Sequence, residues 1–380
     1  MRMLAGFFSL ALGLTVAMAG RVAAQAPAAS PAQGSPAWAY GLPPAGAEPA
    51  AGRGAPPAGT GAQPVARGAA AGQPATTPGQ PGATTPPGQP GAATGQRAGG
   101  RGVPDTSLKH IPGSTAEFTI AQIRDFFNVA DWMPDDHPPM PDVVVHGRAP
   151  SVRGCAMCHM PSGKGRPENA PVAGLPYDYI VQQLSDFKHD LRTSADTRKT
   201  NTAQMIEAAK NMTDEEIKAA ATYFSSMKWT PWIKIVETNT VPKTRISGNV
   251  FFPIPDAGTE PIGHRIIETP VDTSRFELRD PHSGFIAYVP SGSVKKGAAL
   301  VASGGGKTLP CIICHGADLH GIGPVPGIAG RSPSYIVRQL YDIQQGTRKG
   351  VWSPLMVQVV SKLTQDDMIA IAAYVSSRGQ

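Results

Sequence analysis

Cysteine is scarce in this chain, with four residues among 380. All four lie in two copies of the pattern Cys-x-x-Cys-His, at residues 155–159 and 311–315. None remains for a disulfide or for a catalytic thiol outside these motifs. The motif spacing therefore overrides the disulfide framework that four cysteines in an exported chain would otherwise suggest.

The chain also lacks a basic patch of the kind that binds nucleic acid. The net charge is +6 and the isoelectric point is about 9.1, but no run of Lys and Arg has aromatic residues between its members. We therefore expect no nucleic-acid partner. A mild positive charge of this kind favours a partner with an acidic surface.

A long membrane-spanning run is missing as well. Residues 4–16 form an apolar stretch after Arg2, but a bilayer span needs about 20 residues. Two small-residue cleavage patterns follow, at residues 17–19 and 22–24. We predict a signal peptide at residues 1–24 and a periplasmic location, with an uncleaved anchor as the alternative. No cysteine follows the signal, which excludes a lipid-modified N-terminal cysteine.

Residues 25–104 are almost entirely Ala, Gly, Pro, Gln and Thr, with a near-repeat at 77–82 and 86–91. Such a composition cannot bury enough apolar surface to offset the entropy lost on ordering. We predict a disordered tether here. Either it gives the following domains reach between partners, or it is a spacer only.

An internal repeat organises the rest of the chain. Cys155 and Cys311 are 156 residues apart, and residues 179–184 match residues 335–340 at the same offset. Arg192 matches Arg348 at this offset as well. Further on, the last matches fall at an offset of 151, so the first copy has five extra residues in the loop after Arg192.

Both copies predict the same order of elements. Each motif is followed by an irregular Gly/Pro loop, a helix, a second loop and a last helix that begins with a capping Thr and acidic residues. The expected helices cover 177–187 and 333–343, and the last helices begin at 213 and 364. Apolar spacing predicts a further helix over 119–132, and residues 294–303 are another helix candidate.

We therefore predict an all-α fold with two helical domains, at residues 115–228 and 293–380. A connecting segment of irregular structure and short strands, residues 229–292, joins them. The disordered N-terminal tail precedes both.

Cys-x-x-Cys-His is the attachment signature of c-type haem. Two thiols on one helical turn can each form a thioether to a haem vinyl group, and the histidine can bind the iron. A thioredoxin-like redox pair would need no histidine, and a zinc site would combine both cysteine pairs. Two copies, each with its own downstream module, speak against both, so we predict two covalently bound haem c groups. The predicted cofactor-binding residues are Cys155, Cys158, His159, Cys311, Cys314 and His315.

Each copy resembles a class I cytochrome c domain, and the tandem is similar to the two-haem periplasmic cytochromes c built from fused class I domains. The resemblance covers roughly residues 143–228 and 293–380. In that family a methionine in the loop before the last helix is the second iron ligand, and the matching residues are Met205 and Met356. A proline carbonyl also accepts the N–H of the ligating histidine. Pro326 has the expected position for this, whereas Pro171 is displaced by one residue.

Other candidate ligands fit less well. Met212 aligns with Leu363, and Met368 aligns with Ile217, so both positions accept any large apolar residue and are predicted to be core. His189 matches Gln345, and His320 is only five residues from His315. We expect both histidines on the surface.

Histidine and methionine together leave no open position on the iron, which favours electron transfer over chemistry on a bound substrate. The resemblance implies electron transfer between a dehydrogenase or quinol-oxidising donor and a terminal acceptor, with no catalytic residue. Partners would be redox proteins with acidic docking surfaces, attracted by basic residues around the first motif. These residues are Arg148, Arg153, Lys164 and Arg166.

Two alternatives stay open. A haem enzyme, such as a dihaem peroxidase or a thiosulfate dehydrogenase-like protein, would need one iron with an open ligand position, so Met205 and the five extra residues beside it are decisive. A cytochrome subunit of a larger dehydrogenase or oxidase would use the connecting segment as its binding surface. Contact with a membrane is expected only through partner complexes or an uncleaved signal anchor.

Overall fold

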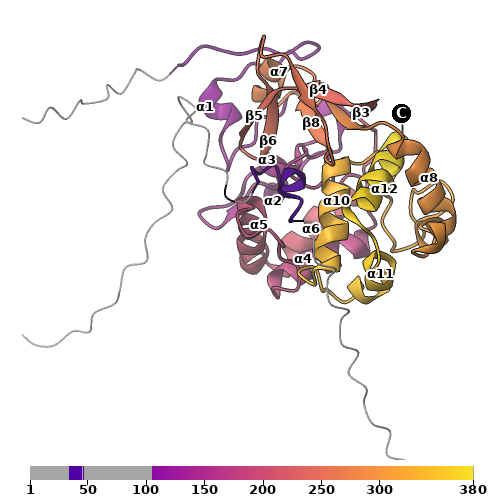
Figure 1. Cartoon of the computed structure of the whole chain (residues 1–380). Helices are drawn as coiled ribbons and strands as arrows, with labels where there is room; N and C mark the ends of the chain where they lie inside the picture. The colour runs from indigo at the N-terminus through magenta and orange to yellow at the C-terminus, as the bar shows by residue number, and fades with distance from the viewer. Residues whose placement is uncertain (1–33, 45, 47–104, 380) are drawn as a thin grey trace, which may run out of the picture. The chain divides into compact units, whose positions relative to one another are not determined.

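The computed structural model describes residues 34–44, 46 and 105–379 (Figure 1). The predicted signal peptide, and the predicted tether apart from residues 34–44 and 46, lie outside the described residues. Within the described part, every helix is too short or too polar to cross a bilayer.

The first repeat unit is helical around its motif, and two of its helices follow the sequence prediction closely. The helix expected at 177–187 is α4, and Thr213 caps α6, with its side chain bonded to the amide of Glu216 in a capping box. The elements of this unit are α1 (Ile120–Ile123), η2 (Pro134–Asp136), α2 (Asp142–Val145), β1 (Gly147–Arg148), β2 (Val152–Arg153), α3 (Cys155–His159), α4 (Tyr177–Lys188), α5 (Thr200–Asn211) and α6 (Asp214–Ser225).

The helix predicted over 119–132 is wrong beyond its first turn. α1 ends at Ile123, and the Asp125 side chain accepts a hydrogen bond from the amide of Phe127. An Asp that bonds its own downstream backbone competes with helical bonding. Trp132 is anchored elsewhere, with its indole N–H donating to the carbonyl of Leu278 at 2.7 Å.

The second repeat unit repeats the order with a longer first helix. Its elements are α8 (Ser293–Ser303), η3 (Gly304–Gly306), α9 (Ile312–His315), α10 (Pro333–Gln344), α11 (Ser353–Val360) and α12 (Gln365–Ser377). α8 crosses α12 at Gly297, where a Cβ atom would collide with the carbonyl oxygen of Ala370. Glycine therefore permits the close approach of these two helices.

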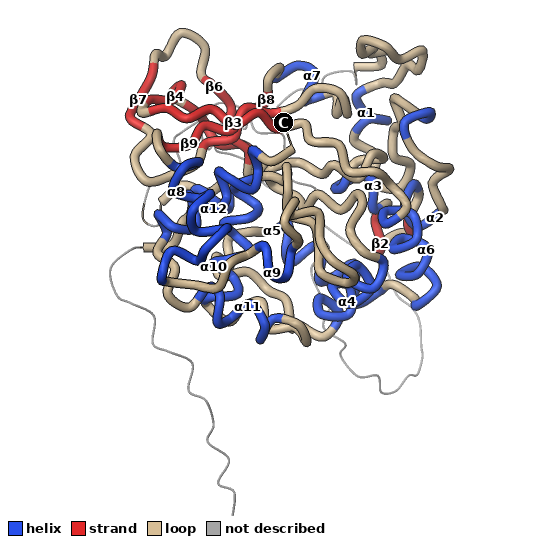
Figure 2. The backbone as a smooth tube through the Cα atoms, turned by 90° about the vertical axis from the view of Figure 1, so that its right-hand side faces the viewer, coloured by secondary structure: helices blue, strands red, loops and turns tan. Residues whose placement is uncertain are grey.

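Strands form much of the connecting segment. They are β3 (Ile233–Thr238), β4 (Thr240–Pro242), β5 (Thr244–Ser247), β6 (Val250–Pro253), β7 (Thr259–Pro261), β8 (Ile267–Pro270) and β9 (Phe285–Pro290), with α7 (Thr273–Glu277) between the last two. β9 is the central strand of a three-stranded sheet, parallel to β3 and antiparallel to β8. The strands gather on one side of the described unit, and α4 and α11 lie on the other (Figures 1 and 2). An all-α chain is therefore not confirmed, because helices dominate only the two repeat units.

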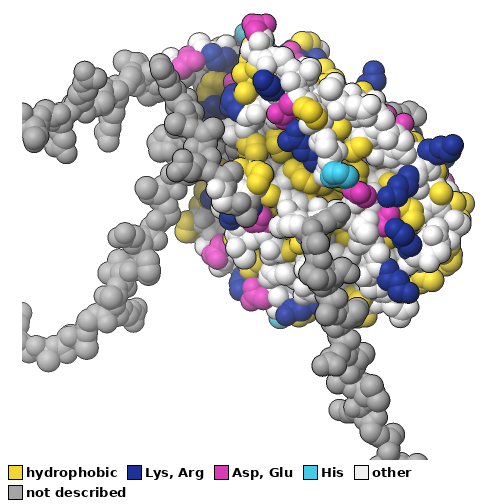
Figure 3. Space-filling view, viewed as in Figure 1, with side chains coloured by type: hydrophobic (Ala, Val, Ile, Leu, Met, Phe, Trp, Pro, Cys, Tyr) yellow, Lys and Arg dark blue, Asp and Glu magenta, His cyan; other side chains and the backbone are white. Residues whose placement is uncertain are grey.

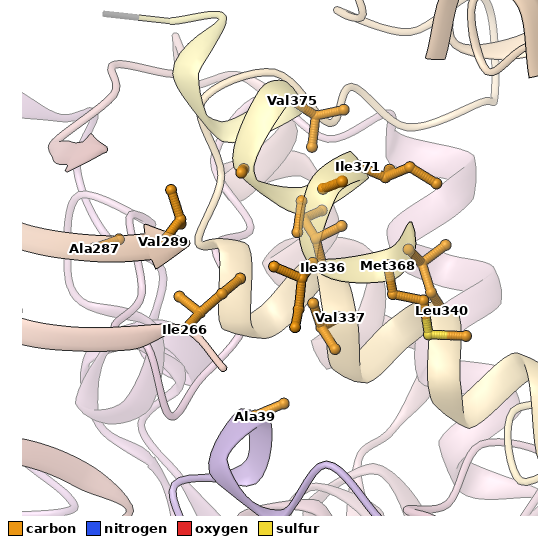
Figure 4. Close-up of a cluster of buried hydrophobic side chains, with 14 of the residues drawn as sticks. Ala39, Ile266, Ala287, Val289, Ile336, Val337, Leu340, Met368, Ile371 and Val375 are labelled. Carbon is orange, nitrogen blue, oxygen red and sulfur yellow. The ribbon is translucent and has the colours of Figure 1, made fainter. Parts of the chain in front are cut away.

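The prediction of a disordered tether is wrong for a short stretch of residues 34–44. Here η1 (Ala37–Tyr40) packs on α10, and Ala39 joins the core cluster that contains Val337 (Figure 4). Tyr40 is fully buried, and its hydroxyl donates to Asp342 at 2.7 Å. The aromatic side chain of Tyr40 buries a large apolar area, which the surrounding Ala, Gly and Pro residues cannot do.

Candidate functional site

The first motif forms α3 and presents its histidine with a fixed orientation. His159 Nδ1 lies 2.8 Å from the carbonyl oxygen of Ala170. A carbonyl only accepts, so Nδ1 carries the proton and Nε2 keeps its lone pair for a metal. Burial lowers the pKa of His159, which favours the neutral ring that binds iron.

The second motif repeats this geometry. His315 Nδ1 lies 2.8 Å from the carbonyl oxygen of Pro326, as predicted, and burial lowers the pKa of His315 in the same way. In the first copy the accepting residue is Ala170 and not Pro171, whose carbonyl accepts from Arg331 Nη1 at 3.0 Å. Ala170 corresponds to Pro326 at the repeat offset of 156. The internal repeat therefore pointed to Ala170 as the residue that accepts the histidine N–H.

A cavity opens beside the first motif and brings two predicted ligands together. Cys155, Cys158 and His159 line it from α3, and Met205 lines it from α5. Its apolar wall comes from α4 and α6 through Ile180, Leu184, Phe187, Ala220 and Phe224. A cavity with thiols and a histidine at one end, a thioether and a long apolar wall fits a haem c group.

Met356 lies on α11, half-buried against the core cluster of the second repeat unit. Both predicted methionine ligands thus lie on helices, Met205 on α5 and Met356 on α11, whereas the family pattern led us to expect loops. The roles of Met205 and Met356 as iron ligands stay predictions.

The other methionines and histidines considered as iron ligands lie in the core or on the surface, as predicted. Met212 and Met368 are buried in the two cores, and His189 and His320 are exposed. No disulfide joins any of the four cysteines, all of which lie in the described residues. In residues 34–44, 46 and 105–379, no three or more His, Cys, Asp or Glu side chains cluster to hold a metal ion, so the cysteine pairs do not combine into one zinc site.

A nearly symmetric hydrogen-bond network joins the two repeat units between their motifs. Arg192 Nη2 crosses to the second unit, donating to the Tyr335 hydroxyl at 3.1 Å. Arg348 Nη2 crosses the other way and donates to the Tyr179 hydroxyl at 2.8 Å. Gln183 and Gln339 each accept from both guanidinium groups. The members correspond in pairs at the repeat offset: Arg192 with Arg348, Tyr179 with Tyr335, and Gln183 with Gln339.

Arg192 and Arg348 bond only neutral side chains in this network, and one buried carboxylate, that of Asp342, lies nearby. Among the described residues, the side-chain partners of both guanidinium groups are neutral oxygens. Arg331 is also buried, donates only to carbonyl oxygens, and has its pKa lowered to about 10 by burial. Buried cations need compensating anions. The residues present therefore fit haem c groups, which bring their own propionate carboxylates.

The extra loop of the first copy binds the second copy and the N-terminal segment. The amide of Thr193 donates to Thr347 at 2.8 Å, and the amide of Ala195 donates to Asp342 at 2.8 Å. Lys199 Nζ is buried and donates to the carbonyl of Tyr40 at 3.2 Å. Burial, with nearby Arg338, lowers the pKa of Lys199 to about 6. The five extra residues thus belong to an interface.

The connecting segment covers the outer face of the first motif. Arg279 Nη2 donates to the carbonyl of Met157, and the same nitrogen lies 3.7 Å from the Sδ atom of Met160. A guanidinium group at the carbonyl end of α3 satisfies an otherwise free acceptor. Arg279 was not a candidate in the sequence, because its partners are more than a hundred residues away.

Two of the four basic residues predicted to surround this motif are taken up by the same segment. Arg166 Nη2 donates to the carbonyl of Phe276 at 2.7 Å, and its guanidinium lies 3.8 Å from the centre of that ring. Lys164 Nζ lies 5.6 Å from the ring centre of Trp232. Arg148 pairs with Glu216 at 2.9 Å. Lys164 and Arg166 therefore contact the connecting segment, whereas the sequence led us to expect that they attract a partner.

Comparisons with known proteins point to one family. A family model described as "Cytochrome c" matches residues 144–228. "Cytochrome c-554(548)" of Halomonas halodenitrificans is 36% identical over 82 residues, which are 21% of this chain and 99% of the relative. "Thiosulfate dehydrogenase electron acceptor" of Thiomonas intermedia is 25% identical over 232 residues, 60% of this chain and 80% of the relative. A solved cytochrome c4 structure from Acidithiobacillus ferrooxidans is 25% identical, covers 59% of this chain and 98% of that one, and has a TM-score of 0.38.

Proposed function

Because this chain belongs to the dihaem class I cytochrome c family and carries two covalently bound haem c groups, we propose that it relays single electrons between its two haems and two redox proteins of the periplasm. The haem supplies the one-electron chemistry when bound. The chain supplies the ligands, the burial and the fixed spacing of the two sites.

The network around Arg192 and Arg348 is the observation that carries this proposal. Arg192 acts on the pKa of His159, and Arg348 acts on that of His315, while each arginine bonds a tyrosine of the opposite repeat unit. The two arginines therefore lie near both histidines and tie the two repeat units together between them. Two sites held at a fixed separation suit electron exchange between them.

We assign Met205 and Met356 as the second ligands. Met205 shares its cavity with His159, and the ring of His159 is held by the carbonyl of Ala170. Two protein ligands on each iron leave no open position, which suits electron transfer and disfavours the binding of a small substrate.

For partners, we propose a dehydrogenase or quinol-oxidising complex as donor and a terminal acceptor downstream. The Thiomonas relative is named as an electron acceptor of thiosulfate dehydrogenase, which supports a dehydrogenase as donor. The net charge of +6 favours partners with acidic docking surfaces. We keep residues 115–228 and 293–380 as the two cytochrome domains, with residues 229–292 between them.

The test is the near-infrared methionine-to-iron band of the oxidised protein, with Met205→Ala as the variant and Met212→Ala as the matched control. Both methionines line the same cavity, but only Met205 is assigned to the iron. We expect Met205→Ala to remove the contribution of one haem and Met212→Ala to keep both. An unchanged band in Met205→Ala would refute this ligand and reopen the enzyme alternative.

A further inference from the structure

The internal repeat allows the outer faces of the two motifs to be compared position by position. The amide of Gly165 donates to the carbonyl of His159, and the amide of Gly321 donates to that of His315, at 2.9 and 2.8 Å. Residues related by the offset of 156 therefore make the same backbone hydrogen bond after each motif. By this offset Ile313 corresponds to Met157, and Ile322 corresponds to Arg166.

The connecting segment covers this face in the first repeat unit. Met157 is 9% exposed beneath Arg279, and Arg166 is held by Phe276. Lys164 lies against Trp232 in the same region. A partner protein cannot reach the outer side of the first motif without displacing these residues.

The second repeat unit leaves the corresponding face open. Ile313 is 65% exposed, Ile322 is 56% exposed and Leu309, just before the motif, is 51% exposed. Large apolar side chains gathered on an exposed surface mark an interaction site. We call the surface of Leu309, Ile313 and Ile322 the second-motif face.

Positive charge lies beside this face. Lys307 precedes Leu309 by two residues, and Lys296 and Lys307 share the carboxylate of Asp367, at 2.9 Å each. Lys295 is exposed on α8 without an ion pair among the described residues. Lys and Arg side chains accordingly gather over the side of the molecule where α8 lies (Figure 3). The combination suits an acidic partner that offers an apolar patch around its own redox centre.

We propose that an acidic redox protein docks on the second-motif face and exchanges electrons with the second haem, and that the outer face of the first motif is closed to such partners by the connecting segment. The inference rests on the proposed electron-transfer function. It makes the two haems inequivalent: this partner exchanges electrons directly with the second haem and reaches the first haem only through the second.

The experiment measures the second-order rate at which reduced plant-type ferredoxin, an acidic protein probe, reduces the oxidised holoprotein. The variant is the double substitution Ile313→Ser and Ile322→Ser, which removes apolar surface without adding charge. The matched control is Val271→Ser, since Val271 is 61% exposed but lies in the connecting segment. Hexaammineruthenium(II), which needs no docking surface, serves as a second reductant.

We expect the ferredoxin rate to fall about fivefold or more in the double variant, because loss of central apolar contacts weakens the encounter complex. The rate should stay unchanged in Val271→Ser, and the ruthenium rate should stay unchanged in both. In the parent, the second haem should be reduced before the first. An unchanged ferredoxin rate in the double variant, or an equal fall in Val271→Ser, would overturn the docking site.

Other occupants of this face would give distinct results. A dimer in sedimentation velocity that the double substitution dissociates would overturn the proposal in favour of a second copy of the chain. A faster ferredoxin reaction after deletion of residues 47–104 would assign the face to that segment. Reversible reduction of both haems by the ruthenium complex tests the electron-transfer function separately, so a failed docking site leaves that function standing.

Discussion

Removing the positive charge of Arg192 should lower the reduction potential of the first haem. Arg192 is buried and lies close enough to His159 to help lower the pKa of that ring. A positive charge opposes the loss of an electron from the iron, so the Arg192→Gln variant stabilises the oxidised state. The same substitution in Arg348 should act mainly on the second haem, through its proximity to His315.

The magnitude follows from the burial of the guanidinium group. At an effective dielectric constant of about 20, a unit charge at an assumed separation of about 8 Å from the iron contributes about 2 kcal/mol. For a one-electron couple, a free-energy change of about 1.4 kcal/mol corresponds to a shift of about 59 mV in the reduction potential. We therefore expect a fall of about 90 mV in the potential of the first haem, with a smaller fall in the second.

The assay is a spectroelectrochemical titration of both haems. Arg192→Lys is the control, since it keeps the charge but loses the paired hydrogen bonds to Tyr335 and Gln339. Its potential should stay much nearer that of the parent. A first-haem potential in Arg192→Gln that rises, or that moves by less than about 20 mV, would refute the electrostatic role of the network.

The remaining predictions concern stability, measured as the free energy of unfolding of the holoprotein in denaturant. Gly297→Ala should destabilise the protein by about 1–3 kcal/mol, because the new Cβ collides with the Ala370 carbonyl. In the control Gly248→Ala the new Cβ meets no atom, so the only cost is that of the positive φ. Equal losses of stability in the two variants would refute the close helix crossing. Tyr40→Phe should destabilise by about 1–3 kcal/mol, because Asp342 loses a buried donor, and an unchanged stability would show that the N-terminal segment is not held there. Burial opposes ionisation of Asp367, but hydrogen bonds from Lys296, Lys307 and Thr364 outweigh it and hold its pKa below the usual range. The stabilisation from this carboxylate is therefore present above about pH 4 and lost as pH falls towards its folded pKa, so the stability difference between the parent and Asp367→Asn should shrink in acid; a constant difference from pH 7 to pH 3 would contradict this.

The sequence predicted the elements whose signals are local. α4, α10 and the Thr-capped last helices follow the predicted ranges, and their signals depend on neighbouring residues only. The helix over 119–132 failed because Asp125 redirects the backbone, which apolar spacing does not reveal.

The remaining features depend on residues that are distant in sequence. Residues 34–44 looked like the tether around them, since the partners of Tyr40 lie on α10 and in the extra loop. Arg331 and Arg279 have no matching residue in the other copy, so the repeat gave no hint of them. Arg192 and Arg348 did stand out as a repeated pair, but only the structure reveals that each bonds the opposite copy.

Mixing the fully reduced protein with carbon monoxide tests the central claim most directly. If His159 with Met205 and His315 with Met356 close both irons, the visible spectrum should stay that of the reduced protein on the timescale of rapid mixing. Formation of a carbon monoxide complex at either haem within that time, in folded protein at neutral pH, would contradict the account and favour a haem enzyme.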